Sequence, residues 1–182
     1  MRRVLPSRPH RLARGAGWGQ NGGDVEAGGT PMTITEWGTT FDWLEINGAE
    51  DSPYPIHHDI AILGWDRDAG TIDLVIRFDD AGGHCQAHRH ITTTTVLVLQ
   101  GEQHLEELLP DGSRRAKVRG TGQHHLTTGD PHPHLERGGP DGAIVFFSHH
   151  SPDGRLYEIV DVDGNVVSTV TIDSLIAMWE NR

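Results

Sequence analysis

The sequence predicts an all-β protein of one domain, a sandwich or closed barrel that ends in a short helix. Apolar runs with strand character recur every eight to twelve residues, with turn signals between them, and this spacing is typical of sandwiches and barrels. The 23 glycines and 10 prolines supply the turns that many short strands need. A closed barrel also leaves few unpaired strand edges.

The clearest strand is expected at residues 71–79. Ile72, Leu74, Ile76 and Phe78 alternate there with residues that are polar except for Val75. The four share one face of an extended chain, and that face is expected to be buried. Residues 58–64 are expected to pair with this strand, and residues 66–70 form the turn between them.

The remaining elements follow from shorter patterns. Only residues 173–180 have helical spacing, with Leu175, Ile176 and Trp179 on one face. Gly101 is expected to break the chain between two strands, because glycine is common where a strand ends. Further strands are expected at residues 96–100, 102–109, 114–119, 143–147, 155–160 and 166–170.

The charge of the chain is uneven. Residues 1–31 carry five arginines and two acids, a net of +3, which leaves −14 for the rest of a chain whose total is −11. We expect residues 1–31 to be a disordered or non-native arm, with Met32 as a plausible start and the domain spanning residues 32–182. A domain this acidic is a poor partner for nucleic acid, whose phosphates attract cationic surfaces.

The sequence also gives expectations about compartment and cysteine chemistry. It has no apolar run near the ~18 residues that cross a bilayer, and its N-terminus lacks the apolar segment of a secretory signal. Cys85 is the single cysteine, so no intramolecular disulfide can form, and we expect it to be a small buried residue. These features predict a cytoplasmic protein without membrane contact.

The candidate site begins with His88 and His90. Residues i and i+2 of a strand point to the same face, so this pair can present two imidazoles to one metal ion. Thirteen histidines occur in the chain, and a lone His-x-His pattern is more often two ordinary polar residues. The neighbouring glycines make the pattern more specific: Gly82 lies six positions before His88, and Gly101 lies eleven after His90.

This spacing resembles the first motif of the cupins, which implies a double-stranded β-helix, the jelly-roll barrel. The glutamate of that motif falls on Thr94, so the sequence departs from the pattern there. Gly129 and His132 match the second motif, which otherwise lacks its proline and has Glu136 in place of its asparagine. The two motifs cover residues 82–136.

More closely, the chain resembles the 2,4′-dihydroxyacetophenone dioxygenase family. The likeness runs through His88 and His90 to Gly101 and resumes at residues 129–132, 144–147, 157 and 163–165. In that family, and in the acetylacetone-cleaving cupins, three histidines hold iron without a carboxylate. The resemblance therefore implies His88, His90 and His132 as ligands and makes the absence of glutamate at Thr94 an expected feature.

Several roles remain open from the residues alone. His134 is an alternative third ligand, although Pro131 and Pro133 disturb regular strand geometry beside it. The Thr94 hydroxyl is expected to hydrogen-bond a bound water or substrate oxygen, unless the residue is simply a strand former. His104 either lines the pocket as an acid–base or supporting group or is an ordinary strand histidine.

The other histidines carry no expected role. His57, His58 and His84 lack a supporting pattern, His124 and His125 are taken as ordinary, and His149 and His150 are expected in a loop.

These features lead to one main functional hypothesis and its alternatives. The main one is a non-haem Fe(II) dioxygenase that uses O₂ to cleave a carbon–carbon bond in a small diketone or hydroxyketone. Three neutral imidazoles leave the charge of a divalent ion uncompensated, which favours an anionic chelating substrate; Zn, Mn and Ni suit the same ligands. The alternatives are a zinc-binding cupin sensor, a non-oxidative isomerase or lyase, and a metal-free binder. A homodimer is the default assembly that the resemblance implies.

Overall fold

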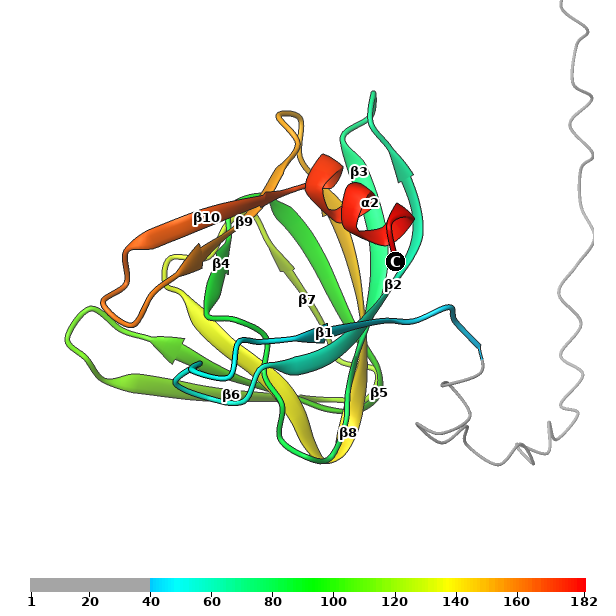
Figure 1. Cartoon of the computed structure of the whole chain (residues 1–182). Helices are drawn as coiled ribbons and strands as arrows, with labels where there is room; N and C mark the ends of the chain where they lie inside the picture. Colours follow the sequence, from blue (N-terminus) through cyan, green and yellow to red (C-terminus); the bar gives the residue numbers. More distant parts are fainter. Residues whose placement is uncertain (1–39) are drawn as a thin grey trace, which may run out of the picture. The chain divides into compact units, whose positions relative to one another are not determined.

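The computed structural model describes residues 40–182. The expected arm at residues 1–31, and its boundary with the domain at Met32, lie outside this range. The all-β prediction is confirmed: strands dominate the described chain and curl around one interior, and a short helix follows the last strand (Figure 1).

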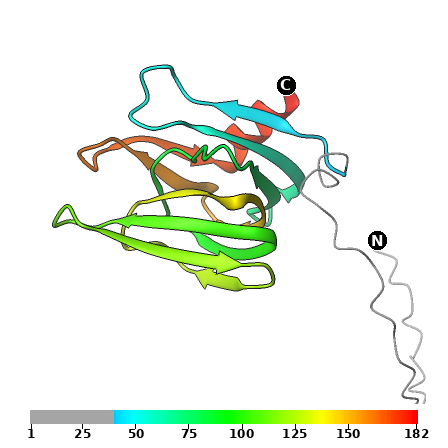
Figure 2. The same cartoon turned by 90° about the horizontal axis from the view of Figure 1, so that it is seen from below.

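Ten strands and one helix make up this part of the chain. They are β1 Leu44–Asn47, β2 His57–Asp66, β3 Thr71–Phe78, β4 His88–His90, β5 Thr93–Leu108, β6 Arg114–Gly120, β7 His124–Thr127, β8 His134–His150, β9 Arg155–Val160, β10 Val166–Thr171 and α2 Ile172–Glu180. The sheet order is β1-β2-β3-β8-β4-β9-β10, and β5 pairs with β6, β7 and β8. In Figure 2, β5, β6 and β7 (green) form one side of the domain, and β1 and β2 (cyan) lie on the opposite side.

The two longest strands, β5 and β8, build the curved frame of the barrel. They run antiparallel from Thr93↔His150 to Glu107↔His134, with register shifts on both sides of Gly101. Gly101 has a φ of 72°, and a Cβ there would lie 2.2 Å from the carbonyl oxygen of Gly142. The expected break at Gly101 is therefore a bend within one strand, which only glycine accommodates.

The apolar core lies on the inner face of the curled sheet. As the alternation predicts, β3 buries Ile72, Leu74 and Phe78, and its partner β2 pairs with it in an antiparallel hairpin. These residues pack with Val145 and Phe147 of β8. The expected strand at residues 143–147 is thus the second half of β8, which continues through His149 and His150; the loop expected at these two histidines is wrong.

Helix α2 closes one end of this core. Thr171 caps it, because its side chain accepts a hydrogen bond from the backbone N–H of Ser174. Its inner face buries Leu175, Ile176 and Trp179, the three residues that the sequence places on one face. Within residues 40–182, no helix has the length and hydrophobicity needed to cross a membrane.

Candidate metal centre

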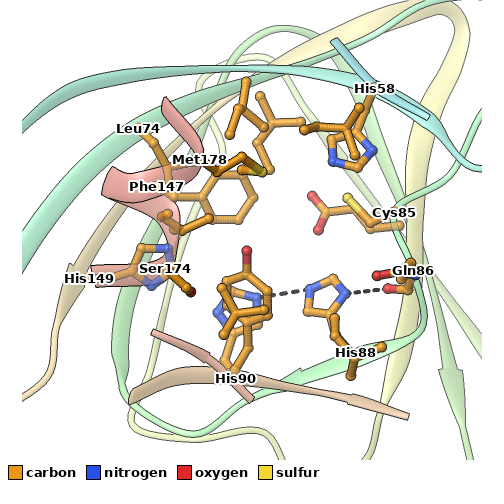
Figure 3. Close-up of a pocket in the computed structure, with 18 residues that line it drawn as sticks. His58, Leu74, Cys85, Gln86, His88, His90, Phe147, His149, Ser174 and Met178 are labelled. Carbon is orange, nitrogen blue, oxygen red and sulfur yellow. Dashed lines mark hydrogen bonds between the residues drawn. The ribbon is translucent and has the colours of Figure 1, made fainter. Parts of the chain in front are cut away.

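Strand β4 aims two imidazoles into the barrel. His88 and His90 are both buried, and the intervening Arg89 points outward, where its guanidinium pairs with Glu158 at 2.6 Å. The Nε2 atoms of the two histidines lie 3.3 Å apart (Figure 3). The expectation that residues i and i+2 of this strand converge therefore holds.

The third imidazole of the cluster belongs to His134. His134 is the first residue of β8, directly opposite His88 in register, and it offers a ring nitrogen within 4.8 Å of those of His88 and His90. His132 precedes the strand between Pro131 and Pro133, is half-buried, and lines a different cavity. The structure therefore brings the alternative residue, His134, and not the preferred His132, together with His88 and His90, because strand register decides which side chain enters the barrel.

Each of the three rings has a different polar group close to its Nδ1. His88 Nδ1 lies 2.7 Å from the carbonyl oxygen of Gln86, His90 Nδ1 lies 3.1 Å from Thr94 Oγ1, and His134 Nδ1 lies 3.6 Å from Asp130 Oδ2. The Gln86 carbonyl can only accept, so it holds the hydrogen of His88 on Nδ1 and leaves Nε2 free to bind a metal. The Thr94 hydroxyl can play the same part for His90.

The electrostatics of the cluster also suit a cation. Burial lowers the pKa of His88, and for His90 and His134 burial and the neighbouring imidazoles hold the pKa well below 6.5. The rings are therefore neutral at pH 7, with lone pairs available for a metal. Three convergent nitrogen donors fit a divalent transition metal and leave coordination positions open on the cavity side.

Thr94 has a different role from the expected contact with water or substrate. It is fully buried, and its hydroxyl lies 3.1 Å from His90 Nδ1 and 3.0 Å from His149 Nδ1. One hydrogen and two lone pairs are all that a hydroxyl offers. The two imidazoles and the Thr92 carbonyl oxygen, which lies 3.4 Å away, account for all three. Thr94 thus orients His90 and joins it to His149, which the extension of β8 brings inside the barrel.

His104 does not line the cavity, so of its two expected roles the structure favours that of an ordinary strand histidine. Its Nε2 lies 2.9 Å from Glu102 Oε2 at the surface. Successive residues of a strand face opposite ways, so the preceding residue, Gln103, is the one that points inward. Gln103 is 1% exposed, and its amide donates to Glu136 Oε1 at 2.6 Å.

Glu136 places a carboxyl group beside the cluster, although not among its converging atoms. It follows His134 by two residues on the inner face of β8 and is 1% exposed. Burial raises its pKa to about 7, against the opposing influence of the Gln103 amide and the Arg119 guanidinium. The sequence presents Glu136 only as a mismatch to a motif asparagine; its i+2 relation to His134 is the signal that identifies it.

His88 and His90 open onto a cavity of about 250 Å³. His134 lines a smaller cavity of about 40 Å³, which His90 also lines. His88 and His90 lie at one side of it, and His58 lies on the wall across from them (Figure 3). Strands β2, β3, β8 and helix α2 supply apolar walls, which include Ile60, Leu74, Ile76, Phe147, Leu175 and Met178. The remaining polar side chains that line it include Glu136, His149 and Tyr157. A small, mostly apolar chamber with a few polar groups is the usual form of a site for a small molecule.

Comparisons with known proteins bear on the fold. No protein-family model matches the sequence, and no curated protein sequence matches it significantly. Solved structures do match. A candidate acetylacetone dioxygenase from Methylibium petroleiphilum PM1 superposes with a TM-score of 0.58 at 14% identity, covering 77% of this chain and 89% of that one.

Two further structures agree with this result. An acetylacetone dioxygenase from Acinetobacter johnsonii has a TM-score of 0.54 at 12% identity, covering 75% of this chain and 90% of that one. An RmlC-like cupin protein from Ralstonia eutropha JMP134 has a TM-score of 0.54 at 14% identity, covering 77% and 81%. At these identities the likeness establishes the fold: the chain is a cupin-fold protein with a three-histidine cluster inside its barrel.

Proposed function

We propose that the protein is a mononuclear non-haem Fe(II) dioxygenase that cleaves a carbon–carbon bond in a small diketone or hydroxyketone. The observation that carries this proposal is the cluster itself: three buried neutral imidazoles converge, with no carboxylate among the converging atoms of the described residues, and two of them line an apolar cavity. His88, His90 and His134 would hold the iron, which would supply a coordination site for substrate oxygens and for O₂.

The charge of this site favours one class of substrate. Three neutral ligands leave the divalent charge uncompensated, so an anionic bidentate ligand, such as the enolate of a β-diketone, gains most from binding there. The apolar walls around Leu74 and Phe147 keep bulk water away from the bound molecule, which strengthens each electrostatic contact inside. Gln103 fixes the carboxyl group of Glu136 beside the cavity, where it can accept the proton that such a substrate loses as its enolate forms.

The names of two structural neighbours support the same chemistry. The protein from Acinetobacter johnsonii is described as an acetylacetone dioxygenase, and the one from Methylibium petroleiphilum as a candidate for the same activity. Acetylacetone is a small β-diketone. They share the fold with this chain at low identity, so they indicate a substrate class to test first.

The direct test is O₂ consumption by the full-length protein loaded anaerobically with Fe(II). We expect O₂ uptake in proportion to added substrate for some member of a panel of β-diketones and aryl hydroxyketones, with cleaved products identified by mass spectrometry. The same protein loaded with Zn(II), which is not redox-active, is the control and should consume no O₂. An iron-bound protein that consumes no O₂ with any member of the panel contradicts the proposal.

One observation favours a second candidate, a non-oxidative isomerase or lyase that uses the same metal. Glu136 places a carboxyl group in the cavity that His88 and His90 also line, and proton transfer at a metal-bound substrate needs such a group. This reading predicts exchange of substrate α-protons with solvent in the Zn(II)-loaded protein without O₂, followed by formation of an isomerised or cleaved product. Exchange that ends without a new product excludes this second candidate, since enolate formation alone is also a step of the first.

A further inference from the structure

His58 is a buried polar residue on an otherwise apolar strand face. It shares the inner face of β2 with Ile60 and Ile62, and its ring lies against Phe78 at a centroid distance of 5.9 Å. His58 is 9% exposed. An isoleucine or leucine would continue the pattern of this face without the cost of burying an imidazole.

The imidazole of His58 lacks hydrogen bonds that meet ordinary geometry. Within residues 40–182, its Nδ1 is sealed from solvent without a hydrogen-bond partner. An unsatisfied buried polar group of this kind is rare in folded proteins and calls for an explanation. Nδ1 is closed off by protein, so Nε2 is the nitrogen that a molecule in the cavity can reach.

The position of His58 in the cavity suggests what that molecule is. Its side chain lines the same cavity as His88 and His90 and lies across it from them (Figure 3). The walls in between are largely apolar, with Leu74, Ile76 and Phe147 among them. A ligand that fills this space meets the metal cluster with one end and His58 with the other.

The surroundings of the ring decide its hydrogen-bonding character. Burial lowers the pKa of His58 to about 4, so the ring is neutral at pH 7, and the backbone of His84 acts in the opposite direction. A backbone group that favours the protonated ring is a carbonyl acceptor. In the Nδ1–H form of the neutral ring, the lone pair lies on Nε2, the nitrogen that a molecule in the cavity can reach.

We propose that His58 is the specificity-determining residue of the cavity and accepts a hydrogen bond from a hydroxyl or N–H group of the ligand. The ligand is then a compact, mainly apolar molecule with metal-binding oxygens at one end and a hydrogen-bond donor at the other. The metal-binding end of this description rests on the proposed function; the contact with His58 does not.

Phenol and toluene form a matched pair of probes for this contact, because they have the same shape and differ in a hydroxyl against a methyl group. Both are titrated into the full-length protein, metal-free and Zn(II)-loaded, and dissociation constants are measured by NMR. The ratio of the toluene constant to the phenol constant should be about 2- to 12-fold larger for wild type than for His58→Phe, the usual effect of one hydrogen bond. An equal ratio in the two proteins overturns the proposal.

Two further variants serve as controls for this comparison. His58→Gln places an amide near the position of Nε2 and should restore part of the phenol preference, which distinguishes a lost contact from a disturbed fold. Ile60→Val alters the same face of β2 and should change the binding of both probes alike. A fall in phenol preference of equal size in Ile60→Val would mean that cavity shape, and not His58, selects the ligand.

A second measurement tests whether one ligand spans both ends. Two β-diketones that differ only by a terminal hydroxyl or methyl group are bound to the Zn(II)-loaded protein, in wild type and in His58→Phe. We expect the hydroxyl compound to lose affinity selectively in His58→Phe. The phenol preference can depend on His58 while the diketone preference does not. That result would support the hydrogen bond to His58 and contradict a ligand that reaches both His58 and the metal. Neither result depends on O₂ chemistry, so failure of the dioxygenase proposal is seen separately.

Discussion

Two walls of the barrel face each other and are built in opposite ways. The β3 wall buries Ile72, Leu74 and Phe78, and its burial stabilises the fold by removing apolar surface from water. The wall made by β4 and the first half of β8 buries His88, His90, His134 and Glu136, whose desolvation costs free energy. The structure offsets that cost with a hydrogen bond or a charged partner behind each group. The first wall therefore holds the fold together, whereas the second depends on the fold for its geometry.

The largest expected effect is on metal binding by the polar wall. His134→Ala removes one of three donors and should weaken binding of Zn(II) or Fe(II) by at least about 100-fold, more than the loss of a supporting partner costs. His132→Ala is the matched control, since it removes a histidine two residues away on the same segment, and it should leave affinity within about 3-fold. Competition with a chromophoric chelator measures both. Equal losses in the two variants would mean that the cluster is assigned to the wrong histidine.

The matching change on the apolar wall is Phe78→Ala. Phe78 is fully buried, so its truncation leaves a cavity and should lower the free energy of unfolding by about 3–5 kcal/mol, as measured by urea denaturation of the metal-free protein. Val118→Ala, at a residue 54% exposed, is the control and should change stability by less than about 0.5 kcal/mol. A loss under about 1 kcal/mol for Phe78→Ala would contradict the assignment of this wall to the stabilising core.

The polar wall and its surroundings should also make the metal-free protein sensitive to acid. Five buried histidines have a lowered pKa because burial penalises the imidazolium ion: His58, His88, His90, His134 and His149. Below pH 6.5 the unfolded chain binds protons that the folded chain does not. The free energy of unfolding therefore decreases as the pH is lowered. For His58 and His149 this loss continues to about pH 4, and the total should be on the order of several kcal/mol.

Glu136 opposes this trend. Its pKa is raised from 4.5 to about 7 in the folded protein, so its contribution to stability is present below pH 4.5 and is lost as pH rises through 7. Glu136→Gln should therefore make stability fall more steeply between pH 6.5 and 4.5 than in wild type. Urea denaturation of metal-free protein across this range tests both statements. A stability that stays constant or rises on acidification would show that the imidazoles are not buried in neutral form.

The smallest effect concerns the partner behind one imidazole. Thr94→Val keeps the shape of the side chain but removes the hydroxyl that lies 3.1 Å from His90 Nδ1, and it should weaken metal binding by about 10- to 100-fold. Thr95→Val changes the neighbouring residue, which faces the other side of β5, and should leave metal affinity unchanged. The Nδ1–H form of His90, seen in ¹⁵N NMR spectra, should lose population in Thr94→Val only. If Thr94→Val changes neither the metal affinity nor the tautomer of His90, Thr94 does not orient this imidazole.

The difference between the walls also explains which predictions from the sequence succeeded. A strand with one apolar face shows a clear period of two in its sequence. This pattern predicts the bounds of β3 to within one residue. The first half of β8 buries His134 and Glu136 on one face and Leu135 on the other, so it shows no alternation and was missed. Likewise, β5 was divided at Gly101, because a glycine that bends a strand and one that ends it look alike in sequence.

The sequence by itself determined the all-β class, the β2–β3 hairpin, the C-terminal helix and the pair His88 and His90. Each of these depends on neighbours within a few residues, which local periodicity records. Tertiary structure decided which other side chains enter the barrel. It brings in His134 and not His132, Gln103 and not His104, and it also places Glu136, His149 and His58 there. These depend on register between strands far apart in the chain, where a shift of one residue turns a side chain from the cavity to the solvent.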